Sequence, residues 1–222
     1  MNKVISNKEA EVLKKHDKIL WSVPPLSNGY HPTPDALVKW YSIIDAALTL
    51  NKKYEKILDA GPGPSNLSLV MREAFPTINE IFCIDRERIS PLLTSNSICR
   101  CFQGDFFEQV ENIPDDSLDL VIDACSVTHF DTNSNFAPND GCYRLAKELN
   151  RILKKGGFYI TASDFSLQGN KSGEFIDVES MISSYELGGL KIYDSSDFNM
   201  EDIFVANRQL SLGVVRLIFQ NE

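Results

Sequence analysis

Ile57-Leu58-Asp59-Ala60-Gly61-Pro62-Gly63-Pro64-Ser65-Asn66 is the stretch of this 222-residue chain that most directly indicates the fold. A short apolar run ends in an acid, two glycines follow with one residue between them, and residues 67–75 carry apolar side chains at helical spacing. This order predicts a strand, a tight turn and a helix. Glycine suits such a turn because a backbone without Cβ can adopt positive φ and lie close to a ligand. The stretch is therefore interpreted as a cofactor cradle, in which Asp59 accepts a hydrogen bond from an amine or a hydroxyl group.

Strand-like and helix-like segments alternate from residue 56 onward, which predicts a mostly parallel sheet with helices on both faces. The expected strands span residues 56–59, 80–85, 98–103, 117–124, 158–162, 190–193 and 214–219. Helices are expected over residues 67–75, 145–153 and 178–187. In a sheet of this kind, ligands bind beyond the carboxyl ends of the strands.

The first 50 residues are expected to form a helical lid or cap on a core domain of residues 51–222. Ser6 and Glu9 have the spacing of a capping box, and Thr33-Pro34-Asp35 predicts the start of a helix that runs to about residue 50. Between these helices lies a loop rich in proline, glycine and aromatic residues. Its Trp21 and Tyr30 either line a pocket or anchor the first helix to the core.

Composition limits the classes of protein to consider. Hydrophobic residues make up 43% of the chain and charged residues 24%, as in a globular domain, and no apolar run is long enough to cross a membrane. Charged residues interrupt the N-terminus, so no secretory signal is expected and the predicted location is cytoplasmic. The net charge of -9 argues against binding to nucleic acid, which needs a basic face. The spacing of the five cysteines and three histidines predicts neither a disulfide scaffold nor a metal site.

Further acids stand at the ends of the expected strands. Asp85 ends the second strand, where a carboxylate can accept hydrogen bonds from both hydroxyl groups of a ribose. NAD-binding folds use the same arrangement, and a helix cap or a surface charge is the plainer alternative. Gly104-Asp105 follows the third strand, and Asp123 ends the fourth.

Taken in order, these motifs resemble those of class I S-adenosylmethionine-dependent methyltransferases. Asp59, Gly61 and Gly63 match the loop under the methionine part of the cofactor, although Ser65 stands where a third glycine is most common. The segment around Lys154-Lys155-Gly156-Gly157 resembles the turn before the family's fifth strand, so the resemblance covers roughly residues 56–162. It implies a Rossmann-like three-layer α/β sandwich whose seven-stranded, mostly parallel sheet ends in an antiparallel strand.

The resemblance also implies roles for single residues. Asp85 would bind the ribose hydroxyl groups, Arg86 would cover the adenine, Asp105 would accept from its exocyclic amine and Phe106 would pack on the ring. Asp123 and Ala124 would lie close to the sulfonium group.

The function implied is transfer of a methyl group from S-adenosylmethionine to a small-molecule acceptor by in-line displacement. His129 follows the fourth strand and is the candidate general base. Candidate substrate contacts are Trp21, Tyr30, His31 and Phe165. The segment after the fourth strand lacks the Asn/Asp-Pro-Pro-aromatic signature of enzymes that methylate exocyclic amines of bases or glutamine amides, which favours a small molecule.

Two other functions remain open at this point. An NAD-dependent oxidoreductase would share Gly-x-Gly and Asp85, but its fingerprint requires glycine or alanine where this chain has Asn66. A non-catalytic S-adenosylmethionine-binding protein would keep the cradle and is compatible with Ser65.

Overall fold

The computed structural model describes residues 3–27, 29, 31–126, 138–166, 178–193, 203–207 and 212–222. Five parallel strands form the centre of its sheet: β2 (Lys56–Ala60), β3 (Glu80–Asp85), β4 (Cys99–Gln103), β5 (Leu118–Asp123) and β6 (Leu153–Ser166). The strand β9 (Leu212–Gln220) pairs antiparallel with β6, so the order from one edge is β4-β3-β2-β5-β6-β9. Three short strands pair antiparallel with β9: β1 (Lys3–Val4), β7 (Lys191–Ile192) and β8 (Val205–Asn207).

The predicted fold class is confirmed. All seven expected strands are present, and the described residues add β1 and β8, each of two or three residues. Segments this short carry too little periodicity to be found in a sequence. The reversal in order between β4-β3-β2 and β5-β6 places a switch point at the carboxyl ends of β2 and β5.

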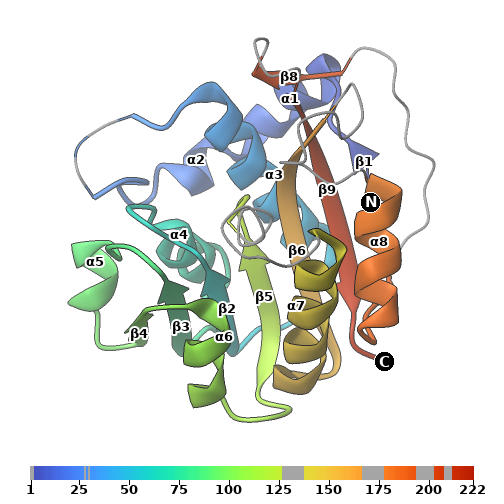
Figure 1. The fold of residues 1–222 in the computed structure, drawn as a ribbon. Coiled ribbons are helices and arrows are strands. Elements are labelled where there is room, and N and C mark those ends of the chain that lie inside the picture. Colours follow the sequence, from blue (N-terminus) through green and yellow to red (C-terminus); the bar gives the residue numbers. More distant parts are fainter. Residues whose placement is uncertain are drawn as a thin grey trace.

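Helices cover both faces of the sheet (Figure 1). One layer contains α3 (Pro34–Leu50) and α4 (Leu67–Ala74), which pack on side chains such as Ile57, Ile81 and Leu120. The other layer contains α6 (Phe106–Gln109), α7 (Pro138–Ile152) and α8 (Val178–Leu187), which pack on Leu58 and Val121. Consecutive strand residues thus enter opposite cores, as expected for a sheet buried on both faces. The remaining helical elements are α1 (Asn7–Leu13), η1 (Lys14–His16), α2 (Asp17–Leu20), α5 (Pro91–Thr94) and η2 (Val110–Asn112).

The N-terminal helices begin largely as expected. The hydroxyl group of Ser6 accepts a hydrogen bond of 3.0 Å from the Glu9 backbone N–H, which caps α1. Helix α3 begins at Pro34, but the side chain of Thr33 makes no capping hydrogen bond. The φ of Pro34, which the proline ring fixes near the helical value, favours the start of the helix at this position.

The N-terminal residues share the core of the sheet. Leu13, Leu20 and Ile44 are fully buried in the same apolar cluster as Ile57 and Ile81. The boundary between a cap of residues 1–50 and a core of residues 51–222 stays a prediction. Among the residues that the structure describes, no helix is both long enough and apolar enough to cross a membrane.

Candidate functional site

The turn after β2 depends on two glycines. Gly61 has φ of 80° and Gly63 has φ of 53°, values that side chains rarely allow. The Gly61 N–H donates to the carbonyl of Ile84 over 2.8 Å, and the Ser126 hydroxyl donates to the carbonyl of Gly61 over 2.7 Å. A Cβ on Gly61 would lie 2.2 Å from the Ser126 Cβ, so no larger residue fits there.

Asp85 joins this turn to the end of β3. One carboxylate oxygen accepts from the Gly63 N–H over 2.7 Å, and the other accepts from the Glu87 N–H over 2.7 Å. Each oxygen has a further lone pair, so the partly exposed carboxylate can still accept from a diol. Ser65, the departure from the third glycine, accepts from the Leu67 N–H over 3.0 Å at the start of α4.

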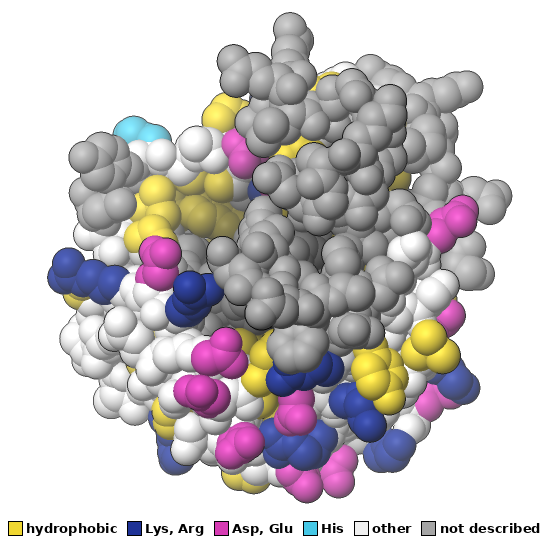
Figure 2. All heavy atoms as spheres, viewed as in Figure 1, with side chains coloured by type: hydrophobic (Ala, Val, Ile, Leu, Met, Phe, Trp, Pro, Cys, Tyr) yellow, Lys and Arg dark blue, Asp and Glu magenta, His cyan; other side chains and the backbone are white. Residues whose placement is uncertain are grey.

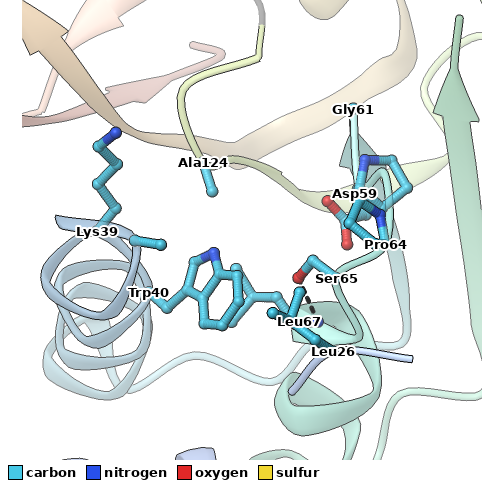
Figure 3. Close-up of a pocket in the computed structure, with 11 residues that line it drawn as sticks. Leu26, Lys39, Trp40, Asp59, Gly61, Pro64, Ser65, Leu67 and Ala124 are labelled. Carbon is cyan, nitrogen blue, oxygen red and sulfur yellow. Dashed lines mark hydrogen bonds between the residues drawn. The ribbon is translucent and has the colours of Figure 1, made fainter. Parts of the chain in front are cut away.

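A cavity of about 160 Å³ lies beside the turn (Figure 3). In Figure 3 the Trp40 indole lies across the pocket from Asp59, with Leu26 and Leu67 beside it. Figure 2 shows hydrophobic side chains gathered on the same side of the molecule, between the positions of α2 and α4 in Figure 1. The cavity is lined by Leu26, Ala36, Lys39, Trp40, Asp59, Gly61, Pro62, Pro64, Ser65, Leu67 and Ala124.

Asp59 brings an unsatisfied charge to this cavity. Asp59 is only 3% exposed, and its Oδ2 atom has no hydrogen-bond partner among the residues that the structure describes. Burial raises the pKa of the Asp59 carboxyl, the nearby Ser68 lowers it, and the charges of Asp123 and Asp85 raise it, so that the pKa is about 7. A buried acceptor without a donor is costly, so this oxygen fits a ligand that brings a cationic amine or a hydroxyl group.

The opposite wall of the cavity carries an ion pair. Lys39 is 6% exposed, and its Nζ atom lies 2.9 Å from Asp164 Oδ2 and 3.6 Å from Asp35 Oδ2. Burial alone would lower the pKa of Lys39, but the charges of Cys125 and Asp164 raise it above its ordinary value, so the group stays an ammonium ion. Neither Lys39 nor Trp40 was predicted as a site residue. Helical periodicity assigns their positions to one face of α3, and it does not separate core from pocket lining.

Three predicted adenine contacts lie at the same edge of the sheet. Arg86 and Asp105 are exposed at the carboxyl ends of β3 and β4, and Asp105 caps α6 by accepting from the Phe107 N–H over 2.9 Å. The structure places Phe106 differently from the prediction. Its side chain is 1% exposed and belongs to the core shared with α7, because it is the first residue of α6 and points under the sheet edge. Ring stacking by Phe106 is not available in this structure.

Asp123 also differs from the prediction. Its carboxylate is fully buried and accepts from the Ser126 N–H over 2.8 Å, from the Tyr159 hydroxyl over 3.0 Å and from the Thr161 hydroxyl over 3.2 Å. These donors hold it away from the cavity, so Asp123 orders the turn that carries Ser126. Its neighbour Ala124 lines the cavity, and its place beside a sulfonium group stays a prediction.

The candidate substrate contacts do not converge. Trp21 is 45% exposed, its ring centroid lies 5.9 Å from that of the exposed His31, and it lines a second cavity of about 600 Å³ with Leu37 and Tyr41. None of these three residues lines the cavity beside the turn, so Trp21 lies at a different cavity. Phe165 is 3% exposed and is buried in the core on the α7 side of the sheet. Tyr30 and His129 lie outside the described residues.

No cluster of three or more histidine, cysteine or acidic side chains that could hold a metal ion occurs in the described part of the chain. The sheet order and the turn after β2 define the class: this chain has the fold of class I S-adenosylmethionine-dependent methyltransferases. Comparison of the sequence with protein-family models gives no match, and comparison with curated proteins gives none either.

Solved structures show which proteins share the fold. Geranyl diphosphate C-methyltransferase from Streptomyces coelicolor A3(2) matches with a TM-score of 0.57 at 12% identity, over 89% of this chain and 85% of its own. A TehB-like methyltransferase from Corynebacterium glutamicum matches with a TM-score of 0.55 at 16% identity, over 97% and 99%. The cyclase SpnF matches with a TM-score of 0.61 at 14% identity, over 98% and 96%. The fold therefore occurs in methyltransferases and also in a cyclase.

Proposed function

We propose that this protein is an S-adenosylmethionine-dependent methyltransferase that acts on a small-molecule acceptor. The observation that carries the proposal is the Oδ2 atom of Asp59, which has no hydrogen-bond partner within the described part of the chain and is buried beside a cavity and a turn built on two positive-φ glycines. A ligand with a cationic amine next to a nucleoside satisfies both features.

The residues present fit the cofactor. Asp59 would hold the ammonium group of its methionine part, the Gly61 and Gly63 turn would lie against it, and Asp85 would accept from the ribose hydroxyl groups. Asp105 and Arg86 would meet the adenine at the adjoining strand ends. When bound, S-adenosylmethionine supplies an electrophilic methyl group on a sulfonium ion.

The protein's own part in the reaction is alignment and exclusion of water. Trp40, Leu26 and Leu67 give the cavity an apolar wall suited to the carbon skeleton of a small acceptor. Lys39 is held by Asp164, so the wall presents an ion pair instead of an uncompensated charge. His129 is proposed as the base for an acceptor that must lose a proton.

Calorimetric titration with S-adenosylmethionine, S-adenosylhomocysteine, NADH and NADPH tests the cofactor. We expect the first two to bind and Asp85→Ala to weaken them by about tenfold to a hundredfold, because hydrogen bonds to a charged group are lost. The matched control is Asp115→Ala, which removes a 70% exposed carboxylate paired with Arg151. Its affinity for the cofactor is expected to equal that of the wild type.

Two results would contradict the cofactor assignment. Tighter binding of NADH than of S-adenosylmethionine would indicate an NAD-dependent oxidoreductase. Binding of none of the four compounds would mean that the turn serves another ligand, and the proposed function would fall while the fold stayed as described.

Turnover separates a methyltransferase from a binding protein. Formation of S-adenosylhomocysteine in the presence of a panel of small amines, phenols, thiols and carboxylates is the measurement. If the cofactor binds and no acceptor yields product, the chain is better described as a non-catalytic binding protein or, like SpnF, as a relative in fold with another reaction. If His129 is the base, His129→Ala lowers kcat with little change in cofactor affinity.

A further inference from the structure

Three cysteines gather on one face of the sheet near its β4 edge. In the register of the parallel pair β3 and β4, Cys83 lies opposite Cys101, and Cys99 lies two residues before Cys101 on the same face. Cys83 is fully buried, whereas Cys99 and Cys101 are partly exposed on β4, the terminal strand of the sheet order. All three are free thiols.

This cluster adjoins the acid of the pocket. Asp59 lies opposite Cys83 in the register of β2 and β3, so Asp59, Cys83 and Cys101 form one row across three strands. Side chains in such a row point to the same face of the sheet. Two residues after Cys83, Asp85 holds the Gly63 N–H of the turn. The thiols are therefore directly connected to the backbone that shapes the cavity.

The spacing allows Cys83 and Cys101 to be joined. Neighbouring strands lie about 4.8 Å apart, within the Cα separation of about 4.4–6.8 Å that disulfides span. Cys99 is a diagonal neighbour of Cys83, at a distance of roughly 7 Å or more by the same geometry, which is at or beyond that limit.

The environments of the two thiols give them different roles. Hydrogen bonding from Cys83 lowers the pKa of the partly exposed Cys101, and hydrogen bonding with Cys101 and, second to it, with Cys99 raises the pKa of the buried Cys83. The thiol with the lower pKa and the better access is the one that attacks a disulfide from solution. Cys101 is therefore the attacking thiol and Cys83 the resolving thiol.

We propose that Cys83 and Cys101 are a reversible redox pair, oxidised by a small-molecule disulfide, and that its closure weakens ligand binding in the adjoining pocket. The second half of this inference rests on the proposed function. In the first step the Cys101 thiolate forms a bond to one sulfur of the small disulfide, whose sulfur–sulfur bond breaks and releases one thiolate. Cys83 then loses its proton, attacks the Cys101 sulfur and releases the second thiolate. The protein loses two protons and two electrons, and the small disulfide becomes two thiols.

Formation of the Cys83–Cys101 disulfide would change the shape of the pocket by moving β3. A disulfide requires a Cβ separation of about 3.8 Å, shorter than the strand spacing, so the bond draws β3 and β4 together at this row. Asp85 and the turn that it holds then shift relative to Asp59. Misplacement of binding groups by about 1 Å is enough for a loss of roughly tenfold or more in affinity.

The first experiment concerns the bond alone. The full-length protein is incubated with glutathione disulfide, alkylated and analysed by intact mass and by tryptic mapping with fragmentation. Trypsin cleaves after Arg86 and Arg100, which separates the peptides of Cys83, Cys99 and Cys101. We expect a loss of about 2 Da, a Cys83–Cys101 cross-link and full reversal by a reducing dithiol. Cys101→Ser should abolish the cross-link, whereas the matched variant on the same strand and face, Cys99→Ser, should retain it.

A cross-link between other cysteines, or stable glutathione adducts without the loss of mass, would overturn the assignment of the pair. Loss of the cross-link in Cys99→Ser as well as in Cys101→Ser would also overturn this assignment. Circular dichroism of each variant shows whether it is folded, and a folded wild type without any cross-link also refutes the proposal.

The second experiment measures affinity for S-adenosylhomocysteine in the oxidised and reduced forms. We expect a fall of about tenfold on oxidation of the wild type and no change in Cys101→Ser. Equal affinity in both forms of a fully cross-linked wild type would overturn the link to the pocket. If the reduced protein fails to bind, the proposed function is wrong, and the mass experiment still decides whether the redox pair exists.

Discussion

At the residue scale, Asp59 shows how burial changes a common side chain. Its carboxyl group lies at the carboxyl end of a buried strand, has one oxygen without a donor, and has its pKa raised by burial to about 7. The sequence shows only an acid before a glycine turn, which predicts the hydrogen-bonding role and not the protonation state. The consequence is that two properties of the protein change in opposite directions with pH.

We predict that cofactor affinity rises with pH between about pH 6 and about pH 7.5, because a cationic amine binds the ionised form of Asp59 and its own pKa lies higher. In Asp59→Asn this slope should disappear and the affinity should be low throughout. Titration calorimetry at several pH values is the measurement. A wild-type affinity that is flat over this range would show that Asp59 does not meet a cation.

The stability of the folded protein should change with pH in the opposite direction and fall as pH rises. Because the folded pKa of Asp59 is raised, its contribution to stability is fully present below the unfolded value of about 4 and is lost as pH rises through about 7. Urea unfolding at about pH 5 and about pH 8 should therefore show a larger loss for the wild type than for Asp59→Asn. Equal losses in the two proteins would mean that Asp59 is ionised throughout.

The positions of some residues, though not their roles, could be predicted where a motif specified them. Asp59, Gly61, Gly63 and Ala124 lie together at one cavity or in its turn, and their contacts with a cofactor stay predictions. Trp21 was selected because aromatic side chains in loops often line pockets. The structure places Trp21 at a second cavity and the other candidate, Phe165, in the core. Which way an aromatic ring points depends on packing against residues distant in sequence.

At the scale of elements, the turn after β2 allows a controlled test of backbone strain. Gly61 and Gly156 have nearly the same φ, 80° and 77°, but different surroundings. A Cβ on Gly61 meets Ser126 at 2.2 Å, whereas a Cβ on Gly156 meets only a Gln220 side-chain atom at 3.7 Å.

We predict that Gly156→Ala costs about 1–2 kcal/mol, the strain of a left-handed backbone alone. Gly61→Ala should cost more, about 3 kcal/mol or above, and should abolish cofactor binding, because the steric conflict displaces the turn or Ser126. Chemical unfolding and calorimetry on both variants provide the comparison. Equal losses of stability would show that the loop bearing Ser126 moves aside without cost.

Elements with strong periodicity were predicted accurately, and the differences have physical causes. The bounds of α3, β3 and α8 match the expectation, because each has several turns or several consecutive apolar residues. Strand β6 was expected over residues 158–162 but runs over Leu153–Ser166, because Leu153 pairs with β5 and nine residues from Phe158 to Ser166 pair with β9. Its later residues include Ser163 and Asp164, whose polarity resembles a loop, and Asp164 is held in place by Lys39 from α3.

At the scale of the whole molecule, one buried ion pair joins three regions. Arg216 of β9 is 2% exposed, and its guanidinium group lies 3.0 Å from the Asp45 carboxylate of α3. The same carboxylate lies 2.9 Å from His16 and 2.8 Å from Lys15, both in η1. Burial alone would raise the pKa of Asp45, but Lys15, His16 and Arg216 together lower it below its ordinary value.

We predict that Asp45→Asn destabilises the protein by about 3 kcal/mol or more, because a buried guanidinium group loses its carboxylate. The matched control is Glu55→Gln in the exposed pair with Lys53, for which little or no loss of stability is expected. The stability that Asp45 contributes is present above its unfolded pKa of about 4 and is lost as pH falls below that value. Unfolding curves of both variants at neutral and acidic pH test this, and a loss no larger than that of Glu55→Gln would contradict it.

By itself, the sequence determined the order of strands and helices, the parallel sheet, and the acid and glycines of the turn after β2. These features follow from local periodicity and from backbone conformations that only certain residues adopt. The tertiary structure decided that Lys39 and Trp40 form the opposite wall of the cavity, that Phe106 and Asp123 are buried, and that Cys83 and Cys101 share a row with Asp59. Such relations depend on register and on packing between segments far apart in the chain, and the spacing of residues along the sequence does not encode them locally.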